Sequence, residues 1–426
     1  MVDIVGGETL ASLWDKLARE CGEKDFFVFQ GRDGGVETFT YRQFNEKINQ
    51  TANMFLREGV AFGELIDAED TVLAEQRALT PDDVCKVLFT SGTTSNPKGV
   101  LLTHGNMVYS GYYGNWETSM TASDRMLTTM PACHSNFQLA ALTPVLTARA
   151  TLIVVEKYSA SRFWSQVREY RATLAQCVAM MLRTLMLQPT DPDERDHSLR
   201  DMLYFLPVSA REKEAFEERF GVRILNTYGS TESIGWVLTD PPTGERKWPS
   251  VGRVGLGYEA KIIDENGNEL PANRVGEICV KGVPGRSLML GYLGNEKATA
   301  EALSSDGWLR MGDKGYFDEE GWFFFVDRKS NMIKRAGENI STTEIEEILT
   351  EHPAVKEAAV IGVPDDIRDE AVKAFILPED DARIDQEDII EYCRRNMAAF
   401  KVPSFIEVVD DFPRTCSMKI EKRLLR

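Results

Sequence analysis

The feature that most constrains the fold is an apolar strand that runs directly into a loop rich in glycine and hydroxyl side chains. Residues 84–90 (VCKVLFT) predict the strand, and residues 91–99 (SGTTSNPKG) form the loop. Glycine lets the backbone approach a ligand closely, and backbone N–H groups, hydroxyls and a lysine can all donate to phosphate oxygens. The loop is not of the Walker A type, because Lys98 precedes Gly99 instead of following a glycine. The ordered string, more than its composition, favours a phosphate site over an ordinary surface turn.

Strands and helices alternate after this loop. Apolar runs predict further strands at residues 151–155, 223–228, 259–264 and 276–282. Helical patterns cover residues 41–56, 163–176 and 211–220. This alternation predicts an α/β fold with large parallel or mixed sheets.

The pattern changes near residue 327. A strand at 322–328 is followed by a polar, hinge-like stretch, and then by a helix start at which Ser341 and Glu344 can form a capping box. Two strands, a helix and another strand follow, which is enough for a small α+β domain. We therefore predict a large domain over residues 1–328 and a small, mobile C-terminal domain over residues 329–426.

Composition narrows the function classes. The chain has 426 residues, too many for one ordinary domain, and a net charge of −18, which argues against a nucleic-acid partner. Its 7 cysteines form no close pairs and its 4 histidines do not cluster, so neither a disulfide framework nor a protein-caged metal is expected. The first residues do not resemble a signal peptide, and no apolar run is long enough to span a membrane. We expect a soluble, cytoplasmic protein.

Six motifs occur in an order that resembles the adenylate-forming superfamily, which includes acyl-CoA synthetases, luciferases and the adenylation domains of peptide synthetases. Within it, residues 156–173, 183–189, 369–375 and 400–404 are most similar to crotonobetaine/carnitine-CoA ligases. The resemblance implies a large N-terminal domain of sheets sandwiched with helices, plus a small C-terminal α+β domain. The motifs are the 90–99 loop, Tyr228–Glu232, Gly312–Asp313, Asp327–Arg328, Lys334–Ile340 and Pro413–Ile420.

The resemblance also implies a role for each motif residue. ATP would contact the phosphate loop and the ribose-binding motifs, Mg²⁺ would bind Glu232, and coenzyme A would enter by a tunnel lined by the loop at Gly337. A carboxylate with phosphates nearby suits Mg²⁺. The implied catalytic residues are Lys419, Thr231, Glu232 and His134; the ATP-binding residues are Thr90, Ser91, Gly92, Thr93, Thr94, Lys98, Tyr228, Asp313 and Arg328; Lys334 and Gly337 belong to the CoA tunnel, and Ser330 is the hinge.

Two departures from the family pattern stand out. A family segment of strands and helices is missing near residues 63–67, and a true deletion there would expose new sheet edges. In the last motif, Met418 stands where the family usually has glycine, which permits a tight turn. A methionine at this position could restrict the turn and so reduce the adenylation activity.

The predicted function is an ATP- and Mg²⁺-dependent acid–thiol ligase that forms an acyl-adenylate and then an acyl-CoA thioester. Its partners are a small-molecule carboxylate and CoA, and its oligomeric state stays open. Crotonobetaine and carnitine carry a quaternary ammonium, for which Tyr112, Tyr113, Trp116 or Trp236 could supply aromatic faces. The alternatives are another small or apolar carboxylate, a carrier protein as acceptor, a luciferase-like oxidation, and nucleotide binding without turnover.

Overall fold

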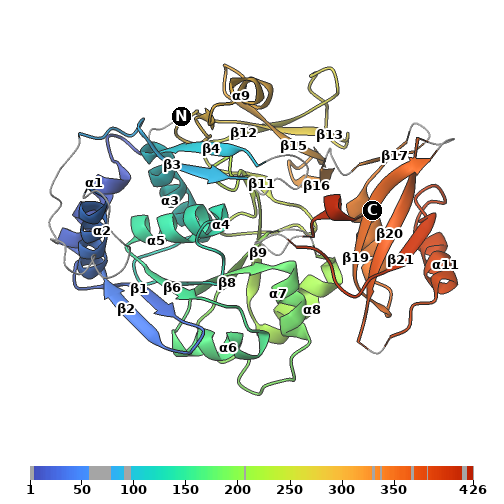
Figure 1. Cartoon of the computed structure of the whole chain (residues 1–426), viewed down its shortest axis with the longest axis horizontal. Helices are drawn as coiled ribbons and strands as arrows, with labels where there is room; N and C mark the ends of the chain where they lie inside the picture. Colours follow the sequence, from blue (N-terminus) through green and yellow to red (C-terminus); the bar gives the residue numbers. More distant parts are fainter. Residues whose placement is uncertain are drawn as a thin grey trace.

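The computed structural model describes residues 4–56, 78–90, 97–205, 208–328, 332–335, 338–365, 369–380, 382–414 and 420–425. Figure 1 shows a large body and a smaller one, the latter built from the C-terminal part of the chain. Among these residues, no helix combines the length and the apolar character needed to cross a membrane.

The largest sheet has nine described strands and a parallel centre. Strands β6, β5, β7, β8 and β9 run parallel beside β1, and antiparallel pairs close both edges. In spatial order the strands are β11 (Arg253–Val254), β10 (Leu238–Thr239), β9 (Arg223–Tyr228), β8 (Asp201–Phe205), β7 (Leu174–Val178), β5 (Arg125–Thr128), β6 (Thr151–Val155), β1 (Asp25–Gln30) and β2 (Val36–Thr40).

Helices cover both faces of this sheet, because successive strand side chains point to opposite sides. On one face, Ile153 packs with the apolar sides of three helices, and on the other face its neighbour Leu152 packs with a second group. The first group is α6 (Ala160–Glu169), α7 (Ala179–Met186) and α8 (Ala210–Phe220). The second is α1 (Leu10–Glu20), α2 (Tyr41–Leu56), α5 (Thr143–Ala148) and the π-helix η2 (Gln138–Leu142), which follows the short α4 (Ser135–Phe137).

Two smaller sheets complete the large body and share a core with α3 (His104–Thr118). One sheet has the order β14 (Gly291–Tyr292), β4 (Gly99–Thr103), β3 (Val84–Phe89). The other has the order β12 (Glu259–Ile263), β13 (Gly276–Lys281), β15 (Trp308–Phe317), β16 (Phe323–Arg328), and α9 (Glu296–Ala302) lies beside it. Strand β3 is an edge strand among the described residues, and the side chain of Phe89 is 68% exposed.

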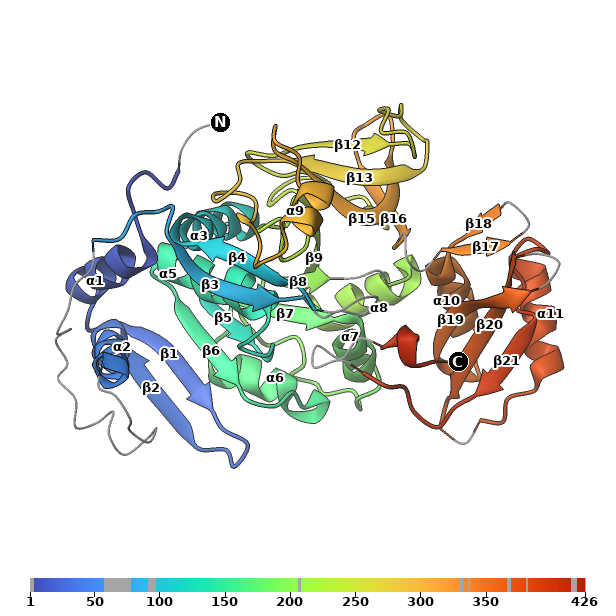
Figure 2. The ribbon, with the colours of Figure 1, turned by 45° about the horizontal axis from the view of Figure 1, so that its top comes forward.

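The smaller body is an α+β unit. Helices α10 (Thr342–Thr350) and α11 (Gln386–Asn396) pack on one face of its sheet, and Phe412 and Leu425 cover the other. Figure 2 shows this unit beside α7 and α8. Its strands are β18 (Glu338–Ile340), β17 (Ile333–Arg335), β20 (Asp369–Pro378) and β19 (Val355–Asp365), with β21 (Phe405–Val408) on β20; the turn η3 (Lys422–Leu424) ends the described chain.

Most sequence expectations for the fold are confirmed, and two are wrong in part. The predicted helix over 163–176 ends at Glu169, because Arg171 adopts a left-handed φ of +50°, and β7 then begins at Leu174. Ser341 caps α10 by accepting from the N–H of Glu344 at 3.2 Å. The Glu344 carboxylate, however, binds Lys401 at 2.6 and 2.7 Å instead of completing the capping box. The expected gap near residues 63–67 lies outside the described residues.

Candidate active site

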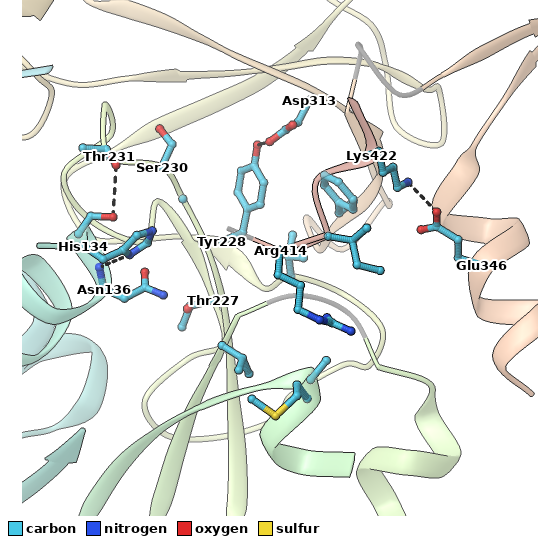
Figure 3. A pocket seen from close by; sticks show the side chains of 18 of the residues that line it. His134, Asn136, Thr227, Tyr228, Ser230, Thr231, Asp313, Glu346, Arg414 and Lys422 are labelled. Atoms are coloured by element: carbon cyan, nitrogen blue, oxygen red, sulfur yellow. Dashed lines mark hydrogen bonds and ion pairs between the residues drawn. The ribbon is translucent and has the colours of Figure 1, made fainter. Parts of the chain in front are cut away.

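A cavity of about 1950 Å³ lies between the large body and the small one. Figure 3 shows its lining side chains converging from the end of β9, from the turn before α4, from β15 and from the small body. The carboxyl ends of neighbouring parallel strands meet at one edge of a sheet, which is where ligands of α/β proteins bind. The cavity lies at the ends of β7 and β9, and several of the residues predicted to bind ATP line it.

The 90–99 loop, which is the predicted phosphate loop, is closed at its base by a pair of hydrogen bonds. The Thr90 N–H donates to the Lys98 carbonyl at 3.0 Å, and the Lys98 N–H donates to Thr90 Oγ1 at 3.1 Å. Both residues line the cavity. The Lys98 ammonium lies 4.8 Å from the centre of the Tyr292 ring. Ser91, Gly92, Thr93 and Thr94, also predicted here, lie outside the described residues.

The end of β9 presents Tyr228 to the cavity, and a tight turn follows at Gly229. A Cβ at Gly229 would lie 2.5 Å from the Gly235 carbonyl oxygen, so this tight turn requires glycine. The Tyr228 hydroxyl donates to Asp313 Oδ2 at 2.6 Å, and both side chains line the cavity (Figure 3). Two motifs that are 85 residues apart in the chain thus meet in the cavity.

Thr231 and Glu232 follow in the same turn. The Thr231 hydroxyl donates to Ser135 Oγ at 3.2 Å, which links this turn to the start of α4. Glu232 Oε1 accepts from the Tyr292 hydroxyl at 2.9 Å. Burial, reinforced by the Glu232 carboxylate, raises the pKa of Tyr292 above its usual range, so the phenol remains a neutral donor.

His134 also lines the cavity and directly precedes Ser135, to which Thr231 donates. It is the N-cap of α4, and its Nδ1 accepts from the N–H of Asn136 at 3.1 Å (Figure 3). Gln176 of β7 donates to the Asn136 carbonyl at 2.8 Å, which anchors the turn to the large sheet. Trp236 also lines the cavity.

The other aromatic side chains considered for a cationic substrate lie elsewhere. Tyr113 is 2% exposed and donates to the Trp236 carbonyl at 2.6 Å, and Tyr112 donates to Glu8 at 2.9 Å. Trp116 packs against the core. These three are structural, and Trp236 is the remaining candidate among the four.

The small body reaches the cavity with its C-terminal segment. Arg414 and Ile420 both line the cavity and pair with each other as an antiparallel bridge. They flank the segment that contains Lys419, which itself lies outside the described residues, as do Ser330 and Gly337. Only the backbone is described for Arg328, at the end of β16, and for Lys334, in β17.

Several cavity residues carry no recognisable sequence signal. Lys422 Nζ lies 2.7 Å from Glu346 Oε1 and donates to Thr342 Oγ1 at 2.7 Å (Figure 3). Burial raises the pKa of Glu346, and Lys422 opposes this shift. Tyr292, a lone tyrosine between a glycine and a leucine, has no catalytic signature either. Only its contact with Glu232 in the folded chain distinguishes Tyr292 from an ordinary buried tyrosine.

Comparison with known proteins identifies the family. Residues 63–293 match the model of the AMP-binding enzymes, and residues 344–419 match the AMP-binding enzyme C-terminal domain. The chain belongs to the AMP-binding enzyme family. It is 40% identical to the crotonobetaine/carnitine–CoA ligases of Citrobacter koseri and Salmonella typhi, and each alignment covers 100% of both chains. These alignments span 517 positions against the 426 residues of this chain, so part of each relative has no counterpart here.

Solved structures support the same fold. ATP-bound MatB from Rhodopseudomonas palustris superposes with a TM-score of 0.87 at 22% identity, over 98% of each chain. The O-succinylbenzoate CoA synthetase MenE from Bacillus subtilis, in complex with ATP and magnesium ion, gives a TM-score of 0.83 at 24% identity, over 97% of this chain and 98% of that one. The predicted adenylate-forming fold and the predicted class, an AMP-forming acyl-CoA ligase that uses ATP and CoA, are confirmed.

Proposed function

We propose that the protein joins a small carboxylate, with crotonobetaine or carnitine as first candidates, to CoA by way of an acyl-adenylate. The observation that carries this proposal is the convergence of Lys98, Thr231–Glu232 and the Tyr228–Asp313 pair on one cavity whose far wall belongs to the small body. The names of the relatives that are 40% identical over the full chain support the substrate.

The phosphate end of ATP would lie at the 90–99 loop and the turn after β9. Lys98 and the hydroxyls of Thr90, Ser91, Thr93, Thr94 and Thr231 would neutralise and position the phosphates, and Gly92 would let the backbone come close. Glu232 suits Mg²⁺: its Oε1 accepts from Tyr292, and no described residue donates to its Oε2. When bound there, the ion would balance phosphate charge, as Mg²⁺ does with one or two carboxylates and substrate phosphates.

The ribose end would lie at Asp313 and Arg328. Tyr228, already bonded to Asp313 at 2.6 Å, would orient that carboxylate toward the ribose hydroxyls. We further propose that the large domain spans residues 1–328 and the small one residues 329–426, with Ser330 as the hinge.

Each half-reaction needs a different part of the small domain. Lys419 would bridge the carboxylate and the α-phosphate during adenylation. The Lys334 and Gly337 loop would line the pantetheine tunnel during thiol transfer. The position of Arg414 and Ile420 at the cavity supports an adenylation-type arrangement of the domains in this structure.

In the first step a carboxylate oxygen attacks the α-phosphorus of ATP, and the bond to pyrophosphate breaks. In the second the CoA thiol, having lost its proton, attacks the acyl carbon, and AMP leaves. The contributions of the protein are positioning and charge neutralisation. His134 would orient the substrate carboxylate, since its ring is held by the N–H of Asn136.

One observation favours a second candidate substrate, an uncharged apolar acid. Met130, Val178, Met180 and Trp236 all line the cavity. These side chains suit a hydrocarbon at least as well as a quaternary ammonium, for which Trp236 would be the aromatic partner.

A panel of carboxylates tests the proposal. Pyrophosphate release and CoA thioester formation should be measured with crotonobetaine, L-carnitine, butyrate, malonate and benzoate, each with CoA and with a phosphopantetheinylated carrier protein. We expect the two betaines to react fastest, with CoA as acceptor. If only uncharged acids react, the proposed substrate is wrong but the assignment as a CoA ligase stands. If no acid causes release of pyrophosphate, the proposed function is refuted.

A further inference from the structure

Tyr292 contacts two residues that belong to different sequence motifs, Glu232 and Lys98. Its hydroxyl donates to Glu232 Oε1 at 2.9 Å, and the Lys98 ammonium lies 4.8 Å from the centre of its ring. The side chain is 8% exposed. One buried tyrosine therefore contacts both the carboxylate proposed for Mg²⁺ and the lysine of the phosphate loop.

The backbone holds Tyr292 in this position from both sides. Strand β14 pairs with β4, so that Tyr292 lies opposite Val100, just after the phosphate loop. The Leu293 N–H donates to the Gly99 carbonyl at 2.7 Å, and the Met289 N–H donates to the Glu232 carbonyl at 2.8 Å. The short segment 289–293 is thus hydrogen-bonded to the end of the phosphate loop and to Glu232, which leaves Tyr292 little freedom to move independently of either.

We propose that Tyr292 is a positioning residue that sets the orientation of the Glu232 carboxylate for a divalent cation and couples it to Lys98. The hydroxyl occupies Oε1, which leaves Oε2 for the ion. The ring supports the ammonium by a cation–π contact. This inference rests on the proposed function, because it assigns Glu232 to the metal.

Two substitutions separate the hydroxyl from the ring. Tyr292→Phe keeps the buried ring and removes only the donor, whereas Tyr292→Leu removes both contacts. A hydrogen bond to a charged group contributes enough that its loss should weaken divalent-cation binding about tenfold. Loss of the ring should in addition weaken metal-free nucleotide binding about threefold, which is the range of an exposed cation–π contact. Tyr109→Phe is a matched control, since it removes the hydroxyl of another buried tyrosine, which donates to the Leu256 carbonyl at 3.2 Å.

The measurement uses Mn²⁺ as the probe, with α,β-methylene-ATP present. Free Mn²⁺ is followed by electron paramagnetic resonance, and metal-free binding of the analogue is measured by calorimetry in EDTA. For Tyr292→Phe we expect the Mn²⁺ dissociation constant to rise about tenfold, whereas the dissociation constant of the ATP analogue measured in EDTA should not change. In a Glu232→Gln background the same substitution should have no further effect, because Tyr292 acts through Glu232.

Two results would overturn the inference. Wild-type Mn²⁺ affinity in Tyr292→Phe would show that the hydroxyl does not position the metal ligand. Equal losses of Mn²⁺ and metal-free nucleotide binding would show a purely structural role. If Glu232→Gln lowers Mn²⁺ affinity while Tyr292→Phe does not, only the role of Tyr292 fails. If the wild type binds neither nucleotide nor Mn²⁺, the proposed function is wrong, and the role of Tyr292 that depends on it is wrong as well.

Discussion

Asp327 joins the large body to the small one in this structure, and its substitution should affect the two half-reactions differently. It is the residue before the last in β16 of the large body and is 1% exposed. Its Oδ2 accepts from the backbone N–H of Thr342 at 2.6 Å and of Thr343 at 3.1 Å, and also from two hydroxyls, those of Thr342 and Ser341. These donors form the N-terminus of α10, where a negative charge is favourable. A rotation about Ser330 would move α10 away from Asp327 and break these bonds.

The strength of this contact can be worked out from its parts. A buried N–H left without an acceptor costs about 1–3 kcal/mol, and a carboxylate at a helix N-terminus contributes about 0.3–1 kcal/mol more. For Asp327→Ala we therefore expect the docked arrangement to lose about 3 kcal/mol relative to the rotated one. That loss corresponds to roughly a hundredfold change in their equilibrium, since each 1.4 kcal/mol is about tenfold. Asp327→Asn keeps an acceptor and lacks the charge, so it should lose about 1 kcal/mol.

The assay measures each half-reaction separately. ATP–pyrophosphate exchange reports adenylation, and conversion of supplied acyl-AMP with CoA reports thioester formation. Asp327→Ala should slow exchange by up to a hundredfold and leave thioester formation equal or faster, with Asp327→Asn between it and the wild type. Equal losses in both half-reactions, or no loss in exchange, would refute the role of Asp327 as a conformation-specific contact.

Three further predictions follow from the site and the core. Glu232→Ala should lower Mg²⁺-dependent pyrophosphate release at least a hundredfold, because the metal loses its carboxylate; near-normal release would contradict the assignment. Lys419→Ala should block acyl-AMP formation, but the variant should still convert supplied acyl-AMP to the thioester. Ser330→Pro, by locking φ, should impair thioester formation more than adenylation. Equal losses in both half-reactions would argue against domain rotation. Burial, together with the nearby Asp240 carboxylate, raises the pKa of Glu117 from 4.5 to about 8. The folded protein therefore binds a proton that the unfolded chain releases, so stability should fall as pH rises from about 5 to above 8. Glu117→Gln should remove this decline and stabilise the protein by on the order of 4 kcal/mol at pH 9, measured by urea unfolding at pH 6 and pH 9; an unchanged pH dependence would show that Glu117 is not the titrating group.

The sequence could predict the strands that lie in the centre of the large sheet. Residues 223–228 were predicted with the bounds of β9, because a short apolar run before a glycine-containing turn is typical of a buried strand. The helix predicted over 163–176 was too long. Periodicity alone does not reveal that Arg171 turns the chain into a left-handed conformation and that the following residues join the sheet as β7.

The motif residues could be predicted because their chemistry is local. A loop of hydroxyls with a lysine, or a turn ending in Thr231–Glu232, carries its donors and acceptors within a few residues, so the string itself indicates phosphate or metal chemistry. Tyr292 and Asp327 differ, because their partners lie 60 residues away at Glu232 and 15 residues away at Thr342.

The sequence by itself determined the α/β class, the order of the motifs and the residues that we propose contact ATP. Only the tertiary structure decided which of these groups touch, because contacts across a sheet edge depend on how strands are paired. The pairing of β14 with β4 brings Tyr292 between Glu232 and Lys98. The docking of α10 against the end of β16 likewise gives Asp327 its donors. Neither arrangement is encoded in a local pattern, since each requires segments distant in the chain to pack together first.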